Sequence, residues 1–254
     1  MLKSNKRGQV TIFIIISVLI VISVSLFFIL RSDFITKNTN EINVDPAIQP
    51  IYNYVDNCVE SSSREVIHTI GAGGGYYEIR PEVSTEVLGI TYYIKDGKNI
   101  MPSKNIIANQ ISGNIETQLE NCTSDLNKEF NDYYIKKKNS SVETKIKSEE
   151  VIIKVEYPIL IRKEESRYDI KEFESRIPIK LGIMYDAIKE FVTKEINSNE
   201  GIDVSDMSEI ASEYKLDFNI IQIDEKGDKF LFMVTESQKE INNKTFIYSF
   251  ANEY

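Results

Sequence analysis

Apolar residues fill one uninterrupted stretch near the start of the chain. Residues 10–30 are mainly Ile, Val, Leu and Phe with scattered Ser and Thr, and none of them is charged. A helix of roughly 20 apolar residues is long enough to cross the hydrocarbon core of a bilayer. A helix buried in a soluble domain usually keeps a polar face over such a length, and this stretch has none. The pattern therefore predicts a single transmembrane helix over residues 9–31.

The charges on either side of this stretch predict its orientation. The leader, residues 1–8, carries Lys3, Lys6 and Arg7, whereas the far side mixes both signs. The positive-inside bias then places the N-terminus in the cytoplasm and the residues after Arg31 outside the cell membrane. A cleaved secretory signal is the competing interpretation, but its apolar region is usually shorter and ends at a small-x-small site. Residues 27–31, Phe-Phe-Ile-Leu-Arg, form no such site, which favours a retained anchor.

The next part of the chain changes from a polar spacer to a helical pattern. Residues 32–45 are polar and predict a spacer, and Pro46 suits a first helical turn with Asp45 as its cap. A glycine-rich run over residues 71–75 then ends the predicted helix. Phosphate loops need a strand before the glycines and a helix after them, and here a strand-like segment, residues 76–79, follows instead. The apolar positions at helical spacing are Ile48, Tyr52, Val55, Val59, Val66 and Ile70.

A hairpin and a second helix are predicted next. Residues 87–94 and 99–101 flank an Asp-Gly pair, which is a strong hairpin signal between β-branched and aromatic residues. Ser103 then caps a helix whose apolar stripe places Cys122 on the face that meets the core. The members of this stripe are Ile107, Ile111, Ile115, Leu119, Cys122, Leu126 and Phe130.

The second half of the chain contains strands, two helices and more strands. Residues 142–147 and 151–161 read as strands, and a polar turn leads to a helix opening at residues 177–181. Asp203 and Ser205 look like caps of a short helix ending near Ser212, and alternating apolar residues then predict strands to the end of the chain. Because helices and hairpins are grouped, we expect an α+β fold of mainly antiparallel sheet with packed helices, in one extracytoplasmic domain over residues 46–254.

Two cysteines lie in the part predicted to be external. Oxidising compartments preserve disulfides, so Cys58 and Cys122 are candidates for a bridge that joins two packed helices. A bridge closing a loop of about 65 residues is worth roughly 4 kcal/mol in the chain-entropy model. The alternative is two buried thiols that pack as small hydrophobic groups.

Net charge argues against a nucleic-acid partner. The chain has a formal net charge of −9, and the segment through Arg31 holds four basic residues and no acid, so the remainder is more acidic still. A surface that follows phosphates needs a concentrated basic stripe. The only run of that kind, residues 136–138, is short and reads as a solvated turn.

Catalytic and metal-binding patterns are weak in this sequence. His68 is the only histidine, and neither cysteine lies in a nucleophile motif. We therefore expect no cofactor, no metal site and no catalytic residue. Asp203, Asp206 and Glu209 are at helical spacing, but acids at a helix start are explained by the helix dipole and its free N–H groups. A glycosidase needs two carboxylates without a local signature, so an anchored hydrolase stays open as an alternative.

The residues at the start of the apolar stretch carry a family resemblance. Arg7-Gly8-Gln9-Val10, with further basic residues upstream, resembles the class III signal peptide of archaeal type IV pilins and related surface proteins. The resemblance covers about the first thirty residues. It implies that a leader peptidase cuts between Gly8 and Gln9 and that the apolar helices of like subunits then pack in a filament. Many filament-forming pilins carry a Glu five residues into the mature helix, whereas this chain has Phe13 there.

Three functions follow from these patterns as expectations. The first is a single-pass, membrane-anchored cell-surface protein without catalytic activity, acting as a pilin-like subunit through its N-terminal helix. The second is a monomeric anchored receptor or envelope-binding protein, in which Gly8 and Gln9 stay joined. The third is an anchored hydrolase such as a carboxylate-dependent glycosidase. In all three the lipid bilayer is a partner and nucleic acid is not.

Overall fold

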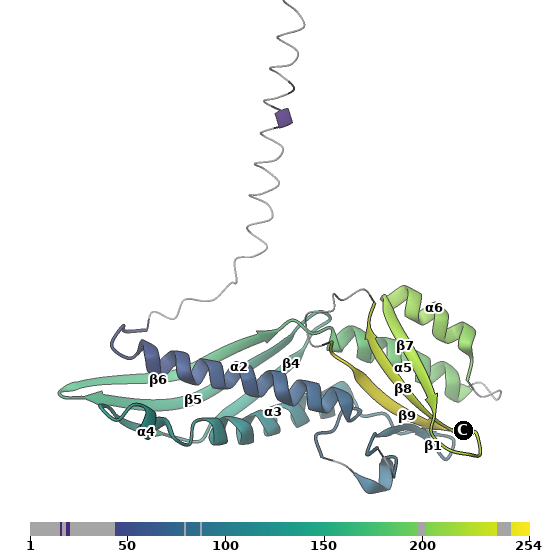
Figure 1. Ribbon diagram of the computed structural model, residues 1–254, viewed down its shortest axis with the longest axis horizontal. Helices are drawn as coiled ribbons and strands as arrows, with labels where there is room; N and C mark the ends of the chain where they lie inside the picture. Colours follow the sequence, from purple (N-terminus) through teal and green to yellow (C-terminus); the bar gives the residue numbers. More distant parts are fainter. Residues whose placement is uncertain are drawn as a thin grey trace, which may run out of the picture. The chain divides into compact units, whose positions relative to one another are not determined.

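The structure is a computed structural model, and it divides the chain into two units, Met1–Asp45 and Pro46–Tyr254 (Figure 1). The described residues are 16, 19–20, 44–78, 80–86, 88–197, 202–237 and 245–254.

The first unit contains few described residues. Ile16, Leu19 and Ile20 are helical and exposed. The rest of the predicted span and the predicted cut between Gly8 and Gln9 lie outside the described part of the chain. Among the residues that the structure does describe, no helix combines the length and the apolar character that crossing a bilayer requires.

The second unit is an α+β domain, as the grouping of elements predicts. Its first part consists of two long helices packed on a sheet (Figure 1). The helices α2 and α3 pack on each other and cover one face of the sheet. The elements of this first part are α2 (Gln49–Ala72), α3 (Lys104–Cys122), α4 (Leu126–Glu129), β3 (Tyr134–Lys137), β4 (Ser141–Ile146), β5 (Val151–Lys163) and β6 (Ser166–Ile177).

Helix α2 begins later than the sequence pattern indicates. Its cap is Ile48 and Pro50 lies in the first turn, so the predicted start at Pro46 is wrong by three residues. Both prolines suit a first helical turn, and local sequence does not choose between them. The glycine-rich run ends the helix as expected, because Gly74 and Gly75 have φ of 71° and 93°.

The strand-like segment after the glycines does not form a strand in its described residues, 76–78. The backbone N–H of Tyr77 donates to the side chain of Gln110 on α3 at 3.4 Å, so it meets a helix side chain instead of a neighbouring strand. Tyr77 therefore contacts α3, a partner that local alternation does not reveal.

Strand β5 is the centre of the first sheet. One edge pairs with β6 along nearly its full length, and the other edge pairs with β4 near its start and β3 near its end, all antiparallel. The register shifts at Pro158, whose missing N–H is tolerated at a bulge. The face towards the helices is at most 1% exposed at Val151, Ile153, Val155, Ile159 and Ile161.

Two strands of this sheet occur where the sequence pattern predicts polar turns. In β6 the buried residues Ile170, Phe173 and Ile177 are spaced by three and four, which hides the strand period. In β3 only Ile135 is buried, between the exposed Tyr134 and Lys136. The predicted solvated turn at residues 136–138 is therefore wrong for Lys136 and Lys137, which belong to β3.

The second part of the unit is a mixed sheet with two helices. The strand order is β2-β1-β9-β8-β7, and β1 pairs with β9 in parallel while the other neighbours are antiparallel. Phe191 of α5 packs against Phe232 and Phe250, with ring centroids at 5.2 and 6.4 Å. The elements are β1 (Tyr92–Lys95), β2 (Lys98–Asn99), α5 (Leu181–Asn197), α6 (Val204–Tyr214), β7 (Leu216–Gln222), β8 (Lys229–Glu236) and β9 (Tyr248–Glu253), and a short 3-10 turn, η1 (Pro81–Val83), precedes them.

The predicted caps Ser103 and Asp203 and the predicted hairpin turn are confirmed, whereas Ser205 lies inside α6 and is not its cap. The Ser103 hydroxyl accepts from the N–H of Ile106 at the start of α3. The Asp203 carboxylate accepts from two N–H groups at the start of α6. Asp96 and Gly97 have φ of 52° and 67°, as a two-residue turn between β1 and β2 requires.

Candidate functional site

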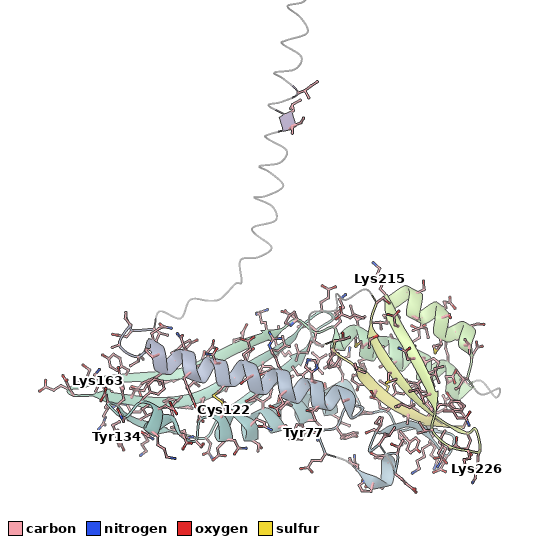
Figure 2. The ribbon with its side chains drawn as sticks, viewed as in Figure 1. Tyr77, Cys122, Tyr134, Lys163, Lys215 and Lys226 are labelled. Atoms are coloured by element: carbon pink, nitrogen blue, oxygen red, sulfur yellow. A yellow bond between two sulfur atoms is a disulfide. The ribbon has the colours of Figure 1, made fainter. Side chains whose placement is uncertain are left out.

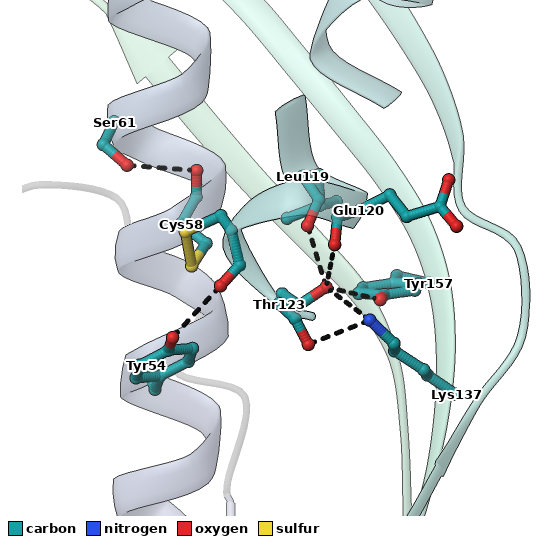
Figure 3. Close-up of a disulfide and its surroundings, with 9 residues drawn as sticks. Tyr54, Cys58, Ser61, Leu119, Glu120, Thr123, Lys137 and Tyr157 are labelled. Atoms are coloured by element: carbon teal, nitrogen blue, oxygen red, sulfur yellow. Dashed lines mark hydrogen bonds between the residues drawn. A yellow bond between two sulfur atoms is a disulfide. The ribbon is translucent and has the colours of Figure 1, made fainter. Parts of the chain in front are cut away.

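The two cysteines of the chain lie side by side on α2 and α3. Their Cα atoms are 5.9 Å apart and their sulfur atoms are bonded at 2.02 Å, which joins the helices covalently (Figure 3). Cys58 is buried because it shares the core-facing side of α2 with Val55 and Val59. Cys122 is the last residue of α3, and its carbonyl accepts a hydrogen bond from Tyr54 of α2 at 3.0 Å.

A polar cluster continues from the disulfide into the sheet. The buried hydroxyl of Thr123 lies 2.8 Å from the Tyr157 hydroxyl on β5 and accepts from the Lys137 amine on β3 at 3.1 Å (Figure 3). The Lys137 amine also donates to the Thr123 carbonyl at 2.9 Å. The cluster satisfies the end of α3 and fixes it to two strands. It therefore has a structural role, and its groups are occupied by one another.

A shallow depression lies at the end of the sheet where the chain enters the second unit. Its volume is about 560 Å³, and we call it the entry-end depression. Tyr133 lies beside the start of α2, because its hydroxyl donates to the carbonyl of Ala47 at 2.7 Å. Figure 2 labels Tyr134 and Lys163 at this end of the unit. The residues that line the depression are Asn127, Asn131, Asp132, Tyr133, Tyr134, Arg162 and Glu164.

The register of the sheet assembles one side of this depression. Tyr134 of β3 lies opposite Arg162 of β5, which in turn lies opposite Arg167 of β6. Arg167 pairs with Asp169 at 3.2 Å, whereas Arg162 has no ion pair among the described residues. Tyr134 is 60% exposed, which is the largest exposed fraction among the large hydrophobic side chains of the described part.

A second polar network is buried in the second part of the unit. Glu195 of α5 is 3% exposed, and its carboxylate accepts from the Tyr254 hydroxyl at 2.5 Å and from the N–H of Asp203 at 2.8 Å. Burial raises the pKa of the Glu195 carboxyl, and the two hydrogen bonds lower it in part. The network ties the end of α5, the cap of α6 and the end of β9 together. Its polar groups bond to one another, which favours a structural role.

The remaining residues considered from sequence lie apart. The ring of His68 packs edge-on against Phe246 at 5.5 Å. Asp206 and Glu209 both face Lys194, at 3.1 and 3.9 Å, while Asp203 caps α6. Within the described ranges no group of three His, Cys, Asp or Glu side chains is placed to hold a metal ion.

The entry-end depression is the feature that sequence reasoning misses. Its residues come from α4, the loop that follows α4, β3, the end of β5 and the β5–β6 turn, and part of β3 reads as a polar turn in the sequence. Adjacent tyrosines at residues 133 and 134, between acids and a lysine run, are the one local signal that could have pointed to it.

Comparisons with known proteins give no relative for this chain. No protein-family model matches it, and neither does any curated protein or solved structure.

Proposed function

We propose that the chain is a non-enzymatic, single-pass cell-surface protein. Residues 1–8 lie in the cytoplasm, residues 9–31 span the membrane, residues 32–45 form a spacer, and residues 46–254 lie outside. The observation that carries the proposal is the uncharged stretch over residues 10–30, which directly follows basic residues. The Cys58–Cys122 disulfide supports it, because oxidising compartments outside the cytoplasm preserve such bonds.

In its more specific form the protein is a pilin-like subunit. A leader peptidase cuts between Gly8 and Gln9, and the N-terminal helices of like subunits pack laterally while the α+β domains face outward. The support is the Arg7-Gly8-Gln9-Val10 pattern immediately before the apolar stretch.

A monomeric anchored receptor or envelope-binding protein is the second candidate. The observation that favours it is Phe13, which occupies the place where many filament-forming pilins carry an acid. The Gly8–Gln9 bond then stays intact, and the exterior domain binds a soluble or cell-wall partner.

N-terminal sequencing of the membrane-extracted protein tests both forms. The wild-type chain and a Gly8→Val variant are expressed in parallel, because a bulky residue before the cut should block the peptidase without changing the basic leader. A wild-type start at Gln9 with an intact leader in the variant supports the pilin-like form. Met1 retained in both, with both chains in the membrane fraction, supports the receptor. Full-length protein in the soluble fraction with reduced thiols contradicts both.

A further inference from the structure

We propose that the entry-end depression binds the phosphoglycerol headgroups of an anionic bilayer surface and so holds the exterior domain against the membrane that anchors it. The inference rests on the proposed function, because the bilayer is near only if residues 9–31 span it. The partner is identified by its chemistry, a phosphate that carries hydroxyl groups.

The side chains of the depression fit such a headgroup. Arg162 is a cation without an ion pair among the described residues, and a guanidinium binds a phosphate through two parallel hydrogen bonds. Asp132 and Glu164 line the same depression, where their carboxylates can accept from the glycerol hydroxyls. A depression with only cations would bind phosphate, whereas this mixture matches a phosphate and hydroxyls together.

Aromatic and basic side chains surround the depression in the combination found at membrane interfaces. Tyr134 is largely exposed, and Tyr133 is covered by the Lys163 amine at 4.7 Å from its ring centroid. Tyrosines lie at the headgroup level because one end is apolar and the other is polar. Lys136 lies on the same face of β3 as Tyr134 and has no ion pair among the described residues.

Farther from this end, basic side chains on the same face of the sheet form ion pairs. There Lys154 and Arg176 are both paired with Glu174, at 3.9 and 2.8 Å, and Lys145 is paired with Glu143. At the entry end, by contrast, Arg162 and Lys136 have no ion pair among the described residues, in a chain whose net charge is −9. These two side chains, with Lys163 beside Tyr133, supply the positive charges at this end that an anionic surface can bind.

The position of the depression along the chain supplies the second argument. The Tyr133–Ala47 hydrogen bond places the depression at the first residues of the second unit. The predicted spacer over residues 32–45 has 14 residues, which reach at most about 50 Å when fully extended. A short tether gives a high effective concentration of the headgroup surface, so modest affinity is sufficient for docking.

Limited trypsin digestion of the full chain in vesicles tests the inference. One set of vesicles contains phosphatidylcholine alone and the other contains equal parts of phosphatidylcholine and phosphatidylglycerol. The readout is the rate of cleavage after Lys163 relative to Lys226, which lies in an exposed turn at the other end of the unit (Figure 2). Docking should slow cleavage after Lys163 roughly fivefold or more in the mixed vesicles, and cleavage after Lys226 should not change.

Two variants sharpen the result. The double variant Arg162→Ala, Lys136→Ala should lose the protection, whereas Lys98→Ala, which removes an exposed cation on β2, should keep it.

Equal relative rates in the two kinds of vesicle, or full protection in the double variant, overturn the inference and leave the anchor intact. Protection that also appears in detergent and grows with protein concentration overturns it in favour of a second copy of the chain. Release of the wild-type chain from both kinds of vesicle by an alkaline wash overturns the proposed function itself, and the inference falls with it.

Discussion

The hydroxyl oxygens of Tyr93 and Tyr248 lie 2.7 Å apart in the core, although the two residues are 155 positions apart in the chain. Tyr93 also donates to the carbonyl of Gly74 at 3.2 Å, so Tyr248 must donate to Tyr93. Burial raises the pKa of both phenols, which therefore stay protonated and keep these bonds over the whole physiological pH range. The pair fixes the glycine turn after α2 to β1 and β9.

This order of donors predicts unequal costs for removing the two hydroxyl groups. Tyr93→Phe leaves both the Gly74 carbonyl and the Tyr248 hydroxyl without their partner, so we expect a loss of about 2–3 kcal/mol. Tyr248→Phe removes one bond and leaves Tyr93 donating to Gly74, so we expect about 1 kcal/mol. The free energy of unfolding in urea measures both. A larger loss for Tyr248→Phe would show that the donors are arranged the other way.

The disulfide predicts a second stability effect. Cys58 and Cys122 are separated by 64 positions, and removing such a cross-link from the unfolded chain costs about 4 kcal/mol in the chain-entropy model. The double variant Cys58→Ser, Cys122→Ser should therefore unfold at a clearly lower urea concentration. Reductant should shift the wild-type midpoint in the same direction and leave that of the double variant unchanged. A reductant-insensitive wild type would mean that the bridge is not formed in solution.

Local signals predicted most of the helices, because caps and glycine turns act within a few residues. Ser103, Asp203 and the Asp96-Gly97 turn all have the predicted roles. Strand β6 was not predicted because its buried residues have helical spacing. The parallel pairing of β1 with β9 was not predicted because the two strands are far apart in the sequence. Pairing across such a distance depends on the whole fold and leaves no local signature.

The entry-end depression was unpredictable for a related reason. Tyr134 and Arg162 become neighbours only through the β3–β5 register, and β3 carries a single buried residue from which a strand could be recognised. The disulfide could be anticipated because the helical spacing that places a cysteine on the face of each helix that meets the core is a short-range pattern. The geometry of a surface site depends instead on which edges pair.

Two glycines on helices should respond in opposite ways to alanine. A Cβ on Gly182 of α5 would lie 2.2 Å from the carbonyl oxygen of Lys147, closer than any real contact, so the helix or the β4–β5 turn must move. A Cβ on Gly113 of α3 meets nothing within 4 Å. We expect Gly182→Ala to cost about 1–3 kcal/mol and Gly113→Ala to gain up to about 1 kcal/mol. Thermal unfolding of the two variants side by side decides this, and a neutral Gly182→Ala would contradict the close approach of α5 to that turn.

Glu195 predicts a pH dependence of stability with a definite sign. Burial raises the pKa of its carboxyl above the ordinary value of 4.5 in the folded protein. A group of this kind stabilises the fold fully below its unfolded pKa, and that contribution is lost as the pH rises through the folded pKa. The difference in unfolding free energy between the wild type and Glu195→Gln should therefore shift in favour of the variant as the pH rises from 4.5.

The exposed Glu213 on α6 supplies the matched control for this measurement. Its replacement by Gln also removes one carboxylate from the protein, but at an exposed position of α6, so it controls for the change in net charge. Urea unfolding at several pH values above and below 4.5 measures all three proteins. If the wild type instead gains stability over Glu195→Gln with rising pH, the hydrogen bonds from Tyr254 and Asp203 affect the pKa of Glu195 more than burial does. The network would then stabilise the charged carboxylate.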